Sequence, residues 1–212
     1  MDDTLKFLEP RSDIDRSQNR LPHWQQPGVL YFVTFRLADS LPVERLDQLR
    51  HERDCNKHVS RQIEQLLDAG AGSCLLAQSD LRCHLAHELS RFDGIRYQNH
   101  AWIIMPNHVH SVFSLAPNWQ LAQVVGAWKG ASARAINRIH CASGTLWQKD
   151  YFDRIIRDMD HFEQCVRYIR RNPKSAGLTP LLYTHFESAI AARVVNCELE
   201  GRLQPPTHNA GG

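Results

Sequence analysis

The sequence predicts an α+β domain in which helices cover a central antiparallel sheet. Three observations support this prediction: strand-like segments alternate with segments of helical spacing, a Pro-Asn turn joins two neighbouring strand-like segments, and the composition allows one substantial core. With 212 residues, 42% of them hydrophobic, the chain lies near the upper end of one domain. We expect that domain over residues 28–178, after an N-terminal arm (1–27) and before a C-terminal tail (179–212) with a disordered tip.

The chain changes character after its first 27 residues. Residues 1–27 are polar and contain three prolines, so we expect an arm whose conformation depends on a partner. Residues 28–37 (GVLYFVTFRL) open with glycine and are rich in β-branched and aromatic residues, which predicts a buried strand. Residues 43–92 show helical spacing instead, broken near AGAGS (69–73). They predict an insertion of two or three helices after the first strand.

Two further strand-like segments lie near the middle of the chain. Residues 96–105 (RYQNHAWIIM) and 108–115 (HVHSVFSL) flank the turn-forming pair Pro106-Asn107. This pattern is typical of a β-hairpin, so we expect these two strands to pair in antiparallel fashion.

The segments after the hairpin predict two helices and a short strand. Apolar residues at helical spacing indicate a helix over residues 119–140 that lies across the sheet. Residues 145–156 (TLWQKDYFDRII) indicate a short strand and a turn. Asp160 and Glu163 have the spacing of a capping box, so the last helix should begin there and stop at Pro173.

Composition excludes several classes of protein. No stretch approaches the roughly 18 apolar residues of a membrane span, and the N-terminus has no apolar signal region. Six cysteines are scattered without a C-x-x-C pair, which is typical of reduced thiols. We therefore expect a soluble, cytoplasmic protein with no membrane contact.

The net charge of +2 hides an uneven distribution of charge along the chain. Residues 39–93 hold ten acids against seven Lys and Arg, whereas residues 126–174 hold ten Lys and Arg against five acids. The basic second half is typical of a phosphate binder, although many basic helix faces are only solvated.

His108 and His110 are the one histidine pair with the spacing of metal ligands. The strand period of two places both imidazoles on one face of the predicted hairpin. They are either ligands of one cation or two strand histidines with other partners. By ligand softness alone, imidazoles favour zinc or another transition metal.

Tyr168 and Asn172 lie four residues apart, and therefore on one face of the last helix. A tyrosine oxygen can attack phosphorus when a metal withdraws charge from the scissile phosphate. The alternative is a tyrosine with its ring in the core and its hydroxyl at the surface. Chemistry alone does not distinguish Tyr168 from the other tyrosines, which are Tyr31, Tyr97, Tyr151 and Tyr183.

Aromatic and cationic residues are interleaved in the basic half of the chain, a composition that suits single-stranded DNA. Aromatic rings can stack on unpaired bases, and cations neutralise phosphates. The candidates for DNA binding are Trp128, Lys129, Arg134, Arg154 and Arg157.

Five motifs in this order resemble the REP-associated tyrosine transposases of bacteria: YFVTFRLADSLP, AWIIMPNHVH, WKGASARAIN, LWQKDYFDRIIRD and YIRRNPKSAGL. Those enzymes belong to the HUH (His-hydrophobic-His) single-strand endonucleases with one catalytic tyrosine. The resemblance extends from about Leu21 to Leu178. It implies a ferredoxin-like HUH fold.

The resemblance also implies roles for individual residues. His108, His110 and Asn172 would hold Mg²⁺ or Mn²⁺, which replaces the inference of zinc from ligand softness, and Tyr168 would be the nucleophile. One tension remains, because Pro173 disfavours helical geometry at Asn172.

The implied activity is metal-dependent cleavage and strand transfer of single-stranded DNA at REP-type palindromic hairpins, through a 5′-phosphotyrosine intermediate. We expect a monomer or weak dimer. Three alternatives stay open: an HUH replication initiator or relaxase-like nickase, a domesticated module that binds DNA hairpins without cutting, and a zinc-stabilised structural domain. A nickase normally carries helicase or primase modules, and a zinc domain needs further ligands.

Overall fold

The computed structural model describes residues 5–12, 15–18, 22–41, 65, 67 and 69–203, with only the backbone of 15–18, 22 and 197–203. Five strands form one open antiparallel sheet in the order β6-β3-β5-β4-β7. Their bounds are Leu30–Arg36 (β3), Tyr97–Ile104 (β4), His108–Leu115 (β5), Phe152–Ile155 (β6) and Thr184–Glu187 (β7). The predicted α+β class and the predicted hairpin are confirmed.

The connectivity of the sheet is ferredoxin-like. The elements β3, α3 (Ser79–Ser90), β4, β5, α4 (Leu121–Ile139) and β6 follow one another as β-α-β-β-α-β. A short 3₁₀ turn, η1 (Leu75–Ala77), precedes α3. The strand β7 extends the sheet beyond β4. This order places β3 and β5 side by side inside the sheet, with a paired strand on each outer side.

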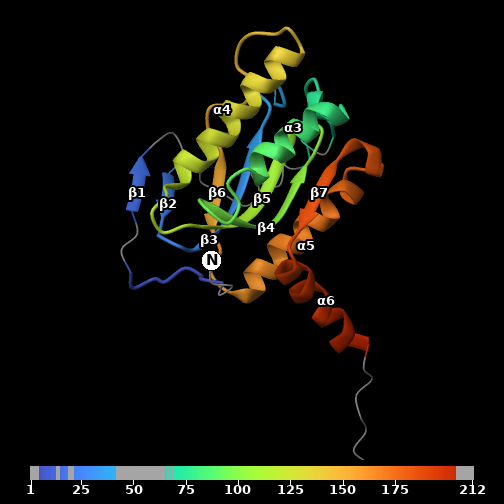
Figure 1. Cartoon of the computed structure of the whole chain (residues 1–212). Coiled ribbons are helices and arrows are strands. Elements are labelled where there is room, and N and C mark those ends of the chain that lie inside the picture. The colour runs from blue at the N-terminus through green and yellow to red at the C-terminus, as the bar shows by residue number, and fades with distance from the viewer. Residues whose placement is uncertain are drawn as a thin grey trace, which may run out of the picture.

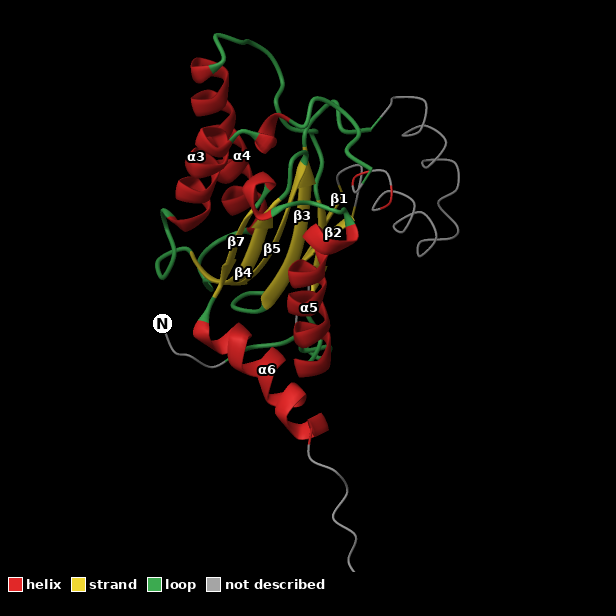
Figure 2. Ribbon diagram, turned by 90° about the vertical axis from the view of Figure 1, so that its right-hand side faces the viewer, coloured by secondary structure: helices red, strands yellow, loops and turns green. Residues whose placement is uncertain are grey.

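Helices cover both faces of the sheet (Figures 1 and 2). The helices α3 and α4 lie on one face, and α5 (Met159–Ser175) packs on the other, where α6 (Ala189–Leu203) joins it. Side chains alternate along each strand. In β3, Tyr31, Val33 and Phe35 therefore join the core under α4, while Leu30 and Phe32 join the core under α5.

The described parts of the segment predicted as an arm pack against the domain. The strands β1 (Asp15–Gln18) and β2 (Pro22–Gln25) form a separate two-stranded antiparallel sheet. Two backbone hydrogen bonds attach residues 5–12 to the main sheet: Leu8 N donates to Ile156 O, and Leu30 N donates to Lys6 O, each at 3.0 Å.

The helix α5, which was predicted as the last helix of the chain, differs from its prediction at both ends. It begins at Met159 because the Asp158 carboxylate accepts a hydrogen bond from His161 N at 2.7 Å, so the predicted cap at Asp160 was wrong. It also continues past Pro173 to Ser175. A proline near a helix end removes only one late hydrogen bond, and the Pro173 carbonyl still accepts from Leu178 N.

The segment predicted as a tail contributes to the fold. After the short turn η2 (Pro180–Leu182), β7 pairs with β4, and α6 packs against α5. The predicted disordered tip, 204–212, lies outside the described residues, as do residues 43–64, 66 and 68 of the predicted helical insertion. The rest of that insertion contains α3. No helix in the part of the chain that the structure describes is long and apolar enough to cross a membrane.

Candidate active site

His108 and His110 project from the inner strand β5 toward α5. Both are almost fully buried, with exposed fractions of 1% and 2%. Their rings lie 4.6 Å apart between centroids. In the register of the sheet, they stand opposite Arg36 and Thr34 of β3. The predicted convergence of the two imidazoles is confirmed.

The amide of Asn107 sets the orientation of His108. Its nitrogen donates to the carbonyl oxygens of Leu67 and Ala71, at 3.1 and 3.0 Å. The Asn107 oxygen is therefore the acceptor for Nδ1–H of His108, at 2.7 Å. This arrangement fixes the tautomer of His108 and leaves its Nε2 lone pair available to a metal.

His110 is oriented by β3. Its Nδ1 lies 2.7 Å from the Thr34 hydroxyl, and its ring stacks on Phe32 with centroids 5.6 Å apart. When Nδ1–H donates to Thr34, Nε2 of His110 carries the lone pair, as in His108. Both imidazoles therefore have one nitrogen held by the fold and the other turned to the same site.

Burial keeps both imidazoles neutral. It lowers the pKa of His108 to about 3, the nearby Arg36 guanidinium lowers it further, and the Asn172 side chain opposes the change in part. Burial, followed by the proximity of His108, also lowers the pKa of His110 well below its ordinary value. A neutral imidazole is the form that binds a metal.

Tyr168 reaches this site from α5. Its hydroxyl oxygen lies 3.3 Å from Nε2 of His110. Its ring contacts His110 and Phe32 edge to face, with centroid separations of 5.0 and 5.9 Å. The phenol oxygen therefore faces the histidine pair, while the ring is packed by aromatic contacts.

Asn172 lies one helical turn after Tyr168 and is buried beside His108. Its Oδ1 is buried without a hydrogen-bond partner among the described residues. The tension raised by Pro173 is resolved, because Asn172 keeps its place in the helix and on the face of Tyr168.

The donor set fits a divalent cation. Two neutral imidazoles and one unpartnered amide oxygen converge, and a buried carbonyl-type oxygen without a partner is costly unless a ligand satisfies it. An oxygen ligand in the set suits Mg²⁺ or Mn²⁺ better than a site of nitrogen and sulfur ligands alone. Among the described residues, no group of three or more His, Cys, Asp or Glu could hold a metal.

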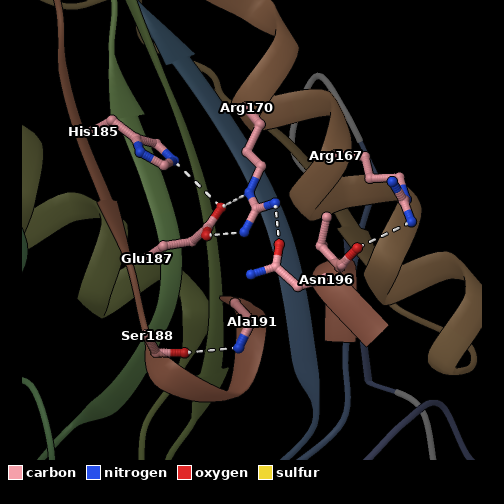
Figure 3. Close-up of polar contacts among 8 residues, drawn as sticks. Arg167, Arg170, His185, Glu187, Ser188, Ala191 and Asn196 are labelled. Atoms are coloured by element: carbon pink, nitrogen blue, oxygen red, sulfur yellow. Dashed lines mark hydrogen bonds and ion pairs between the residues drawn. The ribbon is translucent and has the colours of Figure 1, made fainter. Parts of the chain in front are cut away.

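Side-chain contacts attach α5 to the last strand and helix (Figure 3). Arg170 donates to both carboxylate oxygens of Glu187 in β7, at 2.6 and 2.5 Å, and to Asn196 Oδ1 in α6 at 3.1 Å. Arg167 pairs with Glu163 within α5. It also donates to Val195 O at 3.3 Å. These contacts set the position of the helix that carries Tyr168.

Two of the predicted DNA-binding residues have structural partners. Trp128 lies in the core under α4 with 2% exposure, and its indole N–H donates to the Tyr97 hydroxyl at 3.0 Å. This finding corrects the prediction that Trp128 offers a stacking surface to DNA. The Lys129 ammonium donates to the carbonyl oxygens of Gln148 and Lys149, at 2.7 and 2.8 Å, and thereby attaches α4 to the segment before β6.

The other three predicted DNA-binding residues are exposed. Arg134 lies on α4, on the opposite face of the sheet from Tyr168. Arg154 belongs to β6 and pairs in register with Phe32, which contacts Tyr168. Arg157 follows β6 at the start of the turn into α5. The structure thus brings Arg154, but not Arg134, to the side of the histidine pair.

Sequence analysis missed the residues that orient the histidines. Asn107 had been assigned only to the turn, and Thr34 and Phe32 only to a buried strand. The polar Thr34 within an otherwise apolar strand was the available signal, but its partner is set by strand register.

Comparison with known proteins gives one family. Residues 85–172 match the model of the family described as "Transposase IS200 like". The matched segment contains His108, His110, Tyr168 and Asn172, and it confirms the resemblance inferred from the sequence. No curated protein matches the chain significantly.

Two solved structures are similar to this chain. One is described as a REP-associated tyrosine transposase bound to a REP hairpin, with 18% identity, a TM-score of 0.48, and coverage of 77% of this chain and 76% of that chain. The other is described as a transposase from Deinococcus radiodurans R1, with 18% identity, a TM-score of 0.36, and coverage of 70% and 93%.

Proposed function

We propose that the chain cuts and rejoins single-stranded DNA with Tyr168 as nucleophile, and we start from the match of residues 85–172 to the IS200-like transposase family. The single observation that carries the proposal is the 3.3 Å separation of the Tyr168 oxygen and His110 Nε2. A phenol beside two neutral imidazoles whose Nε2 lone pairs are available to a metal has the geometry of metal-assisted attack on phosphorus. A tyrosine kept only for packing has no need to direct its hydroxyl there.

In the cleavage step, the Tyr168 oxygen forms a bond to phosphorus while the bond from phosphorus to the 3′ oxygen breaks. The phenol gives up its proton to solvent, and the departing 3′ oxygen gains one. The product is a 5′-phosphotyrosine and a free 3′-hydroxyl. Aromatic contacts with His110 and Phe32 hold the tyrosine ring, so little orientation has to be acquired at the moment of attack.

Rejoining is the same chemistry in the reverse direction. The 3′-hydroxyl of a second strand attacks the phosphotyrosine, and the bond from phosphorus to the Tyr168 oxygen breaks. One phosphodiester is exchanged for another, so strand transfer requires no external energy source. This balance favours a strand transferase over a hydrolase.

His108, His110 and Asn172 would hold the cation, which we propose to be Mg²⁺ or Mn²⁺. When bound, the cation neutralises charge that develops on the phosphate. The protein supplies the rest of the site: Asn107 and Thr34 fix the imidazole tautomers, and burial keeps the rings neutral.

We further propose that the substrate is single-stranded at the cut and carries a palindromic hairpin of the REP type. The motif resemblance to REP-associated tyrosine transposases supports the hairpin. The need for the tyrosine to reach the backbone supports an unpaired cut site. The exposed arginines near the site, Arg154 and Arg157, support binding to a polyanion.

The Tyr168→Phe variant tests the proposal. It removes one oxygen and keeps the ring that packs on Phe32, so the fold and DNA affinity should stay close to wild type. An oligonucleotide carrying a hairpin from the flanks of the gene, labelled at its 3′ end, should form a covalent adduct with wild-type protein only. The fragment 5′ of the cut should end in a free hydroxyl.

The Tyr151→Phe protein is the matched control. The Tyr151 ring stacks on His23, its hydroxyl is buried, and burial raises its pKa, so this tyrosine is a poor nucleophile. Its variant should form the adduct at the wild-type rate. An adduct that survives in Tyr168→Phe, or peptide mapping that finds the label on Tyr151, overturns the assignment.

A further inference from the structure

The edge strand β6 presents an exposed aromatic ring on the same face of the sheet as the histidine pair. Phe152 is 39% exposed, whereas most large aromatic side chains of the described residues lie in one of the two cores. Single exposed apolar residues are common on protein surfaces, so the position of Phe152 relative to the histidine pair, and not its exposure alone, makes it a candidate for base stacking.

The register of the sheet fixes the position of Phe152 relative to the site. Phe152 pairs with Thr34, and Thr34 pairs with His110, so the three residues form one row across β6, β3 and β5. Paired residues point to the same face. Two strand spacings separate the ends of the row, which places the backbone of Phe152 roughly 10 Å from that of His110.

Arg154 adds a cation to this edge. Its guanidinium lies over the Phe152 ring, 5.4 Å from the centroid, and its side chain is exposed. It also lies near α5: burial raises the pKa of the Cys165 thiol to about 12, and Arg154 partly opposes that rise. The guanidinium therefore lies next to the exposed ring and is close enough to α5 to influence the Cys165 thiol.

We propose that Phe152 and Arg154 form a nucleotide-binding step beside the cut site, with an unpaired base stacked on Phe152 and its phosphate bound by Arg154. The proposal rests on the proposed function, because it assigns a place to the single strand that enters the site. Single-strand binding combines an aromatic platform with a cation in this way, and base stacking tolerates any sequence.

The position favours DNA over a protein partner. A protein segment that paired with the outer edge of β6 would bind through backbone groups, would have to displace the contacts between β2 and β6, and would not require an aromatic ring next to the histidine row. A strand whose phosphate lies at the Tyr168 oxygen has a neighbouring nucleotide that must cross either α5 or the β6 edge. The exposed side chains of α5 on either side of Tyr168, Gln164 and Arg171, are not aromatic, whereas Phe152 offers an exposed ring on which a base can stack.

The test uses a probe whose binding does not depend on cleavage. A ten-nucleotide thymidine oligomer with one 5-iodouracil is mixed with the Tyr168→Phe protein and irradiated. The cross-link should map to Phe152. Affinity for the same oligomer should fall by about 5- to 100-fold in a Phe152→Ala background, the range expected for loss of one stacked base.

Two companion variants distinguish stacking from simple burial of apolar surface. Phe152→Trp keeps an aromatic face and should retain wild-type affinity, whereas Phe152→Leu keeps apolar area only and should bind as weakly as Phe152→Ala. The control Ile95→Ala removes another exposed apolar side chain, which lies two residues before the start of β4, and this variant should bind the oligomer as wild type does. Circular dichroism should give the same folded spectrum for all of them.

Failure of this inference differs from failure of the proposed function. Wild-type affinity in Phe152→Ala, a Phe152→Leu protein that binds normally, or a cross-link on another residue overturns the nucleotide-binding step, whatever Tyr168 does. If the Tyr168→Phe protein gives the cross-link on Phe152 but wild-type protein forms no adduct at Tyr168, the nucleotide-binding step is supported and only the proposed chemistry is overturned.

Discussion

The hydroxyl oxygen of Tyr168 lies 3.3 Å from Nε2 of His110, although 58 positions separate the two residues in the sequence. Backbone pairing on both sides of β5 fixes the histidine. Side-chain contacts alone fix the tyrosine, because α5 touches the sheet through packing and through Arg170. The site therefore joins two layers of the fold that are stabilised by different kinds of interaction.

The first prediction concerns the metal. We expect wild-type protein to bind one Mn²⁺, as measured by electron paramagnetic resonance, and replacing His108 and His110 together by Ala should abolish both this binding and cleavage. Asn172→Ala should raise the Mn²⁺ concentration needed for half-maximal binding, because it removes one ligand of three. The control His84→Ala changes an exposed histidine of α3 and should leave both measurements unchanged. Cleavage in excess EDTA equal to that in Mg²⁺ contradicts the metal assignment.

The second prediction concerns stability and pH in the metal-free protein. The pKa of His108 is about 3 in the folded state, below the ordinary value of 6.5, and the pKa of His110 is also lowered. As pH falls below 6.5, these two histidines bind protons in the unfolded chain but not in the folded chain. Their contribution to stability is therefore fully present above pH 6.5 and decreases toward pH 3.

As pH falls through that range, each of the two histidines should lower the free energy of unfolding by up to about 1.4 kcal/mol per pH unit. Urea unfolding in EDTA at pH 7.5 and 5.5 measures the difference. In His108→Gln this difference should shrink, since one titrating group is gone. An unchanged pH dependence in the variant would mean that His108 is not held neutral by the fold.

The third prediction concerns the position of Tyr168. Arg170→Ala removes the paired contact with Glu187 and the contact with Asn196, so it should lower stability by about 1–2 kcal/mol. Adduct formation should fall more than DNA affinity, because the variant loosens the helix that carries the nucleophile. The neighbouring exposed residue gives a matched control, Arg171→Ala, which should match wild type in thermal unfolding and in cleavage. Equal losses in both variants would point to charge rather than position.

The fourth prediction concerns salt. Arg154→Gln and Arg157→Gln should each weaken binding of single-stranded DNA and lower the slope of log affinity against log salt by about 0.7, as expected for the loss of one phosphate contact. Lys129→Gln should instead lower the melting temperature, because its ammonium is bound to two carbonyl oxygens. Arg91→Gln, a change at the exposed end of α3, is the control for net charge. A slope that falls equally in Arg91→Gln would show only a general charge effect.

The sequence predicted those helices and strands that have a clear pattern of apolar and polar residues within their own segment. Alternation and composition identified β3, β4 and β5, and helical spacing identified α4, with Trp128 on its apolar face. The prediction that Trp128 binds DNA was wrong because its helical spacing with Leu121 and Val125 places it on the buried face of α4, although cationic residues adjoin it in the sequence. The strand β7 was missed because its four residues have no clear alternation and depend on pairing with β4.

The partners of the histidines could not be predicted from spacing. Thr34 lies 76 residues before His110, and only strand register brings the two together. The spacing of Tyr168 and Asn172 predicted a shared helix face, but the histidine that this face meets depends on how α5 packs on the sheet. The start of α5 was misplaced by two residues because Asp158 and Asp160 are equally good caps by type, and backbone geometry chooses between them.

Asn107 connects the orientation of His108 to a segment of the chain that lies far from the histidines in sequence. Its amide nitrogen donates to the carbonyl oxygens of Leu67 and Ala71, before α3, and its oxygen accepts from the His108 ring. A sequence change that shifts those two carbonyls would rotate one amide and, with it, the His108 imidazole. If His108 is a ligand as proposed, changes near residues 67 and 71 would alter metal affinity without replacing any proposed ligand.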